Sequence, residues 1–113
     1  MHNAEKIDIP IDVYNSPTEF VLVMPLGWVD KASISLRLEN NFLTIAWRRV
    51  SPSFKETLIP KIQWCFWWPF TKRVELPTNS YFNNIQSELT PENILIITVP
   101  KVFMPDELSI KIQ

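Results

Sequence analysis

The chain has 113 residues, of which 46% are hydrophobic and 20% charged, values that fit one globular domain and exclude an intrinsically disordered chain. The formal net charge of −1, from 11 basic and 12 acidic residues, leaves no excess of positive charge to bind nucleic acid. One glycine and ten prolines exclude long helices and favour short strands between turns.

Side chains that carry catalysis or bind metals are scarce. The single cysteine, Cys65, allows no internal disulfide and no thiolate metal site, and His2 is the only histidine, so no Ser–His or Cys–His pair is credible. We therefore expect no enzyme activity and no cofactor. No apolar run approaches the roughly 20 residues of a membrane span. Because the N-terminus also lacks a signal-like stretch, we expect a cytoplasmic protein without a membrane span.

The N-terminal part of the chain predicts two strands joined by a turn. Apolar and polar residues alternate from 7 to 13, which predicts a half-buried strand, and Pro10 places it at a sheet edge because proline has no N–H to donate. Residues 15–18, Asn-Ser-Pro-Thr, predict the turn. The apolar run Phe20–Met24 predicts a strand buried on both faces.

The clearest local element is a hairpin over residues 34–47. Its two halves alternate apolar and polar residues on either side of Asn40-Asn41, and asparagine tolerates the positive φ that both positions of a type I′ turn require. Such a turn fixes the register and leaves one face of the hairpin apolar. The cross-strand pairs that it predicts are Leu38 with Leu43, Leu36 with Ile45, and Ile34 with Trp47.

Residues 49–69 form a long connection that ends in Trp64, Cys65, Phe66, Trp67 and Trp68. A compact domain seldom carries about 20 residues of connection without a purpose. Aromatic residues this dense indicate an interface with another chain, a surface for client proteins, or a small core folded back over the same domain. A short strand is expected within 58–66, whereas a stacking platform for nucleic acid is disfavoured because no basic residues interleave the rings.

The last third of the chain predicts one more strand and a second hairpin. Phe70–Leu76 is the strand, and Ile85–Leu89 pairs with Ile94–Val99 around the turn Thr90–Asn93. Leu89 then faces Leu95, with Ser87 beside Ile97 and Ile85 beside Val99. The whole pattern predicts an all-β protein, an antiparallel, immunoglobulin-like β-sandwich of about 7–9 strands.

The order of these elements resembles the α-crystallin domain of small heat shock proteins from about residue 9 to residue 112. The stretches that carry the resemblance are 10–14, 26–34, 70–77, 87–95 and the terminal Ile110-Lys111-Ile112. It implies a short extension over 1–8, an α-crystallin-like domain over 9–101, and a C-terminal tail over 102–113 with an Ile-x-Ile motif.

The chain also departs from the family pattern. Asn93 stands where the family prefers glycine, Gly27 is one place off the usual Pro-Gly, and Lys72 replaces the first of two arginines. The first strand begins within about ten residues, where family members usually carry a long apolar arm. The resemblance then implies smaller oligomers and weaker or different client binding.

The resemblance implies three binding sites. Ile110 and Ile112 would dock between the strand at 34–38 and the strand at 85–89 of another dimer, although the tail could instead pack on its own domain or stay disordered. The groove candidates, which could equally be plain core, are Leu36, Leu38, Ser87 and Leu89.

The second implied site is the 49–69 loop, whose strand would cross to a partner and pair with residues 8–14 of that chain. The third is Lys72-Arg73, placed by the resemblance at the dimer interface, while the plainer interpretation is a solvated basic pair. The protein would then be an ATP-independent holdase of the stress response. Its partners would be unfolded or aggregation-prone proteins and itself, as a homodimer or small oligomer. The alternative is an adaptor or co-assembly subunit of the same fold with little general chaperone activity.

Overall fold

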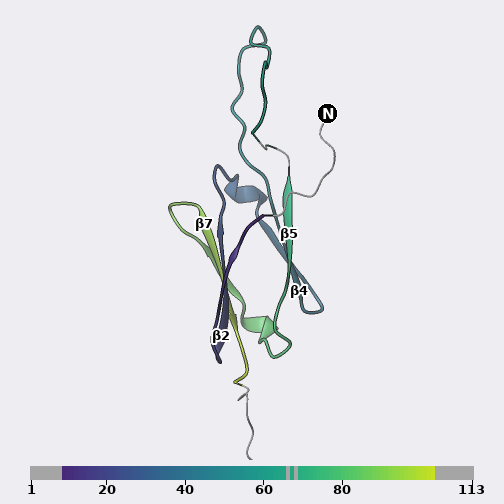
Figure 1. Cartoon of the computed structure of the whole chain (residues 1–113), viewed down its shortest axis with the longest axis vertical. Helices are drawn as coiled ribbons and strands as arrows, with labels where there is room; N and C mark the ends of the chain where they lie inside the picture. The colour runs from purple at the N-terminus through teal and green to yellow at the C-terminus, as the bar shows by residue number, and fades with distance from the viewer. Residues whose placement is uncertain (1–8, 66, 68, 104–113) are drawn as a thin grey trace, which may run out of the picture.

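The computed structural model describes residues 9–65, 67 and 69–103, and these form two antiparallel sheets stacked as a sandwich (Figure 1). One sheet has the strand order β1-β2-β7-β6 and the other has the order β3-β4-β5. The elements are β1 (Asp12–Asn15), β2 (Glu19–Pro25), the 3-10 turn η1 (Lys31–Ser33), β3 (Ser35–Glu39), β4 (Phe42–Trp47), β5 (Phe70–Glu75), the 3-10 turn η2 (Phe82–Asn84), β6 (Gln86–Leu89) and β7 (Ile94–Pro100). The predicted all-β sandwich is confirmed.

The core lies between the sheets and comes from the inward face of each central strand. Alternate residues along a strand point to opposite faces, so each strand contributes every second side chain. Burying this much apolar area is the main driving force for folding. The most deeply buried side chains are Leu22, Met24, Leu26, Ile45, Leu76, Ile97 and Val99.

Strands β1 and β2 differ in detail from the prediction. Strand β1 begins at Asp12, after Pro10, whose nitrogen has no proton for the ladder. The strand also includes Asn15, which pairs with Phe20. It does lie at a sheet edge, as predicted. Strand β2 is not buried on both faces: Leu22 is fully buried, whereas Val21 is half-exposed because its face of the sheet has no second layer over it.

Both predicted hairpins form. Strand β3 pairs with β4 and β6 with β7 in the predicted registers, while Ile34 and Ile85 lie just before their strands. The expected type I′ turn at 40–41 is wrong, because only Asn40 has a positive φ, of 58°. Asn41 is instead held to strand β5 through its side chain, which donates to Glu75 Oε2 and to the Leu76 carbonyl at 3.2 Å each.

The 49–69 loop extends beyond the strands at one end of the sandwich (Figure 1). The expected strand within 58–66 is absent from the described residues 58–65, where the chain has no ladder partner. One isolated bridge joins Arg49 to Val29 at the start of the loop, and a turn places the Leu58 N–H 2.9 Å from the Lys55 carbonyl. The backbone contacts that tie the described part of the loop to the sandwich lie near its base.

Candidate functional site

The described part of the 49–69 loop exposes its apolar side chains. Ile59 is 84% exposed and Trp64 82%, values that belong to an unfolded chain more than to a domain surface. Both residues line a pocket of about 360 Å³, and so does Trp67, which is half-exposed. Other apolar residues around the same pocket are Pro52, Phe54, Leu58, Pro60 and Ile62. Whether the rings of 64–68 fold back as a small core over the same domain or meet another chain stays a prediction.

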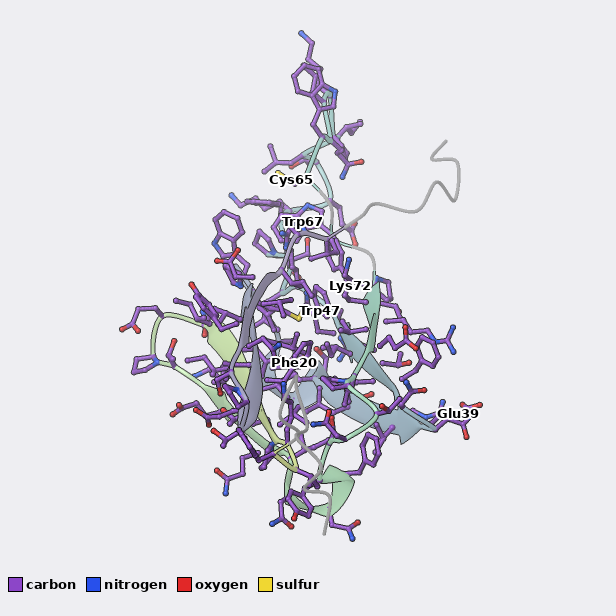
Figure 2. The ribbon with its side chains drawn as sticks, turned by 60° about the horizontal axis from the view of Figure 1, so that its bottom comes forward. Phe20, Glu39, Trp47, Cys65, Trp67 and Lys72 are labelled. Atoms are coloured by element: carbon purple, nitrogen blue, oxygen red, sulfur yellow. The ribbon has the colours of Figure 1, made fainter. Side chains whose placement is uncertain are left out.

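Both ends of this loop are fixed by an aromatic stack in the core. Trp47 ends strand β4 and Phe70 begins β5, and their rings lie 5.5 Å apart with planes inclined by 12°. The guanidinium carbon of Arg49 lies 4.8 Å from the Phe70 ring centroid. Figure 2 shows Cys65 and Trp67 on the projecting loop, beyond Trp47 in the sandwich. The loop therefore presents its apolar residues from a rigid base.

Another exposed aromatic residue, Trp28, lies beside the base of the loop. Trp28 is 71% exposed and adopts a left-handed backbone with φ of 57°, a conformation that bulky residues rarely take. Its carbonyl accepts a hydrogen bond of 2.7 Å from the N–H of Val50, which is also exposed. The apolar surface of the loop, which includes Val50, thus continues onto Trp28. Sequence reasoning missed Trp28, since nothing in the sequence marks it as left-handed.

The groove candidates lie on β3 and β6, which are edge strands of different sheets. Each one pairs across its hairpin with a buried core residue, so all four belong to the inward face. Even so, Leu38 is 41% exposed and Ser87 is exposed, while Leu36 and Leu89 are half-buried. These residues face inward but are not fully buried, because they lie on edge strands where the sandwich is open. Whether another chain docks there stays a prediction.

The structure separates Lys72 from Arg73. Lys72 pairs with Ile45, so it belongs to the inward face of β5 and is half-buried. Arg73 points to the outer face, where its guanidinium carbon lies 3.9 Å from the ring centroid of Phe42. The two are therefore not one solvated basic pair, and their role at a dimer interface stays a prediction.

Comparisons with known proteins agree on the architecture. No protein-family model and no curated protein matches the sequence. Heat shock protein 16.0 from Schizosaccharomyces pombe superposes with a TM-score of 0.75 at 18% identity, covering 96% of this chain and 100% of that one. A small heat-shock protein from Xylella fastidiosa gives 0.71 at 22% identity, covering 96% and 98%. The hspA protein of Xanthomonas axonopodis gives 0.66 at 25% identity, covering 81% and 91%.

The chain has the small heat shock protein fold. The resemblance predicted from the sequence is thereby confirmed for the architecture. The replacement of the usual glycine by Asn93 leaves the turn intact, because Asn93 takes the left-handed conformation with φ of 66° and donates to the Thr90 carbonyl.

Four of the predicted site residues lie outside the described residues. They are Phe66, Trp68, Ile110 and Ile112. The described chain ends beside the β1–β2 turn, at the end of the sandwich opposite the 49–69 loop (Figure 1). There the Lys101 N–H donates to the Thr18 carbonyl at 2.9 Å, and Asn79 Nδ2 donates to the Val102 carbonyl at 2.6 Å. The start of the tail is therefore anchored.

The described ranges lack two further classes of site. No group of three or more His, Cys, Asp or Glu side chains is placed to hold a metal ion there. Nor does that part of the chain contain a helix long and apolar enough to cross a membrane. The thiol of Cys65 is free and exposed.

Proposed function

We propose that this protein is an ATP-independent holdase of the cytoplasm, which binds unfolding proteins and limits their aggregation. The observation that carries the proposal is the 49–69 loop, whose large apolar side chains are exposed although the sandwich is folded. Unfolding proteins expose apolar side chains of the same kind, and burying both sets releases free energy without a nucleotide. The fold shared with small heat shock proteins supports this activity.

The same loop is proposed to join two copies of the chain. Strand β1 is an edge strand with four exposed residues, so one side of its backbone is open to pairing. The loop of a second copy, within 58–66, would add a strand to that edge and cover its own apolar side chains in doing so. Client binding and pairing between copies would then compete for one segment.

The tail is proposed to act as a third contact. Ile110 and Ile112 are two apart, so in an extended tail they project to the same side. They would enter the opening between β3 and β6 of another dimer, where Leu38 and Ser87 are exposed on the inward face. Such a contact is weak for one tail and effective when many copies act together.

Light scattering from a heat-stressed client enzyme tests the holdase proposal. Excess protein should suppress the scattering equally with and without ATP. A Trp64→Ser variant should protect less, whereas Phe103→Ser, which also removes one exposed aromatic ring but at the C-terminal end of the described chain, opposite the loop, should protect fully. Absence of protection by the wild-type chain would contradict the proposal. Capture of one defined partner in place of many unfolding proteins would favour the adaptor.

A further inference from the structure

The outer face of the three-stranded sheet carries an ordered arrangement of charges. On this face β3 exposes Arg37 and Glu39, and β5 exposes Arg73 and Glu75. The central strand β4 contributes only uncharged, half-buried side chains between them. Those are Phe42, Thr44 and Ala46.

Strand register groups the residues of this face into rows across the sheet, and two of these rows carry the charges. Arg37, Thr44 and Arg73 are direct neighbours in one row, and Glu39, Phe42 and Glu75 are direct neighbours in the next. Residues two apart on a strand are about 7 Å apart, and β3 lies two strand spacings, about 10 Å, from β5. The Cα atoms of the four charged residues therefore form a rectangle with both arginines on one side and both glutamates on the other, and the Arg73 side chain leans from its corner toward Phe42.

The net charge of this face is zero, but its positive and negative charges lie in separate rows. Among the described residues, the ion pair is that between Arg48 and Asp30. Neither arginine of this face therefore forms an ion pair with Glu39 or Glu75 of the same chain. Two positive and two negative charges suit neither a polyanion nor a polycation. They suit a surface with the same pattern in the opposite order.

We propose that the outer face of β3-β4-β5 binds the same face of a second copy around a two-fold axis that crosses the strands at right angles between the two rows. That rotation places the arginine row of one copy over the glutamate row of the other. Arg37 then faces Glu39 of the second copy and Arg73 faces its Glu75, and each pair occurs twice because the contact is isologous. Phe42 faces Thr44 at the centre.

The charges also select this orientation over the alternative. A two-fold axis parallel to the strands would place Arg37 against Arg73 and Glu39 against Glu75, where every close pair repels. Pairing between sheets whose strand directions stay within about 30° is a common packing mode for β-sheets. The contact uses neither the 49–69 loop, nor β1, nor the tail, so it is separate from the contacts in the proposed function.

Charge reversal on β3 tests the contact. Arg37→Glu alone should create two repelling pairs in a homotypic contact, and so should Glu39→Arg. An equimolar mixture of the two variants restores attraction at every corner, because each new charge meets its opposite on the other chain. Neither side chain makes a hydrogen bond that the fold needs within the described chain, and far-UV circular dichroism checks folding.

Sedimentation velocity of the full chain provides the measurement. We expect the wild-type mass to double between about 0.5 M and 0.02 M salt, because surface charges are screened at the higher value. Each single variant should lose this step, the mixture should regain it, and Glu88→Arg, on the outer face of the other sheet, should behave as wild type. A wild-type mass without this salt step, a folded Arg37→Glu variant that keeps it, or a mixture that fails to recover it would overturn the proposal.

Discussion

Trp47 and Phe70 stack in the core with ring centroids 5.5 Å apart, and they are the last residue of β4 and the first residue of β5, the two strands that the 49–69 loop connects. We predict that Phe70→Ala lowers the free energy of unfolding by about 3–5 kcal/mol, because it removes a buried ring and leaves a cavity. Urea unfolding followed by tryptophan fluorescence measures this change.

Phe103→Ala provides the matched control for that stack. This phenylalanine is exposed, so its loss should change the free energy of unfolding by no more than about 0.5 kcal/mol. Equal destabilisation by the two substitutions would mean that the stack at the base of the loop does not belong to the cooperative core.

The left-handed backbone of Trp28 predicts an unusual order of stabilities. Asparagine accepts this conformation, whereas a β-branched residue resists it. Trp28→Asn should therefore be more stable than Trp28→Val by about 1–2 kcal/mol, although both remove the same exposed ring. The difference between the two unfolding free energies is the measurement, and equal values would show that the strain at residue 28 is negligible.

Particular residues show how far the sequence determines the fold. The registers of both hairpins follow from alternating apolar residues, because a shift by one would turn Leu36 and Leu38 to the outer face. The turn at Asn40 was predicted with the wrong type, since the bonds that hold Asn41 come from strand β5, 34 and 35 residues away. Val21 was expected to be buried because apolar character alone does not reveal whether a second layer covers a sheet.

Asp30 combines two roles that substitution can separate. It accepts a hydrogen bond from the Ala32 N–H at the start of η1, and it pairs with Arg48 at 3.0 Å. Asp30→Asn keeps the cap and should lose no more than about 0.5 kcal/mol, because exposed ion pairs contribute little. Asp30→Ala removes both the cap and the ion pair, and it should lower the free energy of unfolding by about 1 kcal/mol more than Asp30→Asn, mainly because the cap is lost. Thermal unfolding compares them, and an Asn variant as unstable as the Ala variant would assign the stability to the ion pair.

The single cysteine supplies a probe of the 49–69 loop. Cys65 is exposed in the isolated chain, so a thiol reagent should modify it rapidly in dilute protein. If the loop pairs with β1 of a second copy, the rate should fall severalfold as protein concentration rises, because pairing covers this segment. Phe103→Cys in a Cys65→Ser background gives the control at the opposite end of the sandwich. A rate at Cys65 that is independent of concentration would contradict pairing through the loop.

The candidate site was predictable in part, for reasons that differ between residues. The aromatic density of 64–68 marks the loop for a partner whatever its conformation, and Trp64 is exposed accordingly. In contrast, the opposite directions of Lys72 and Arg73 follow from their pairing with β4, which links positions about 27 to 29 residues apart. The sequence carried no signal for Trp28, because the hydrogen bond that its carbonyl accepts comes from Val50, which is distant in the sequence.

The tail prediction concerns residues beyond the described chain and is tested through assembly size. Burying one isoleucine contributes roughly 1.5–3 kcal/mol before the loss of tail freedom is subtracted. Replacing Ile110 and Ile112 by serine should therefore reduce the light-scattering mass as much as truncation after Leu108, while Lys111→Ser should leave it unchanged. Leu38→Arg should reproduce the loss, because it places a charge at the exposed inward side of β3. A truncated chain with the wild-type mass would exclude tail docking, and loss of mass in the Lys111→Ser variant would assign the contact to charge instead of apolar burial.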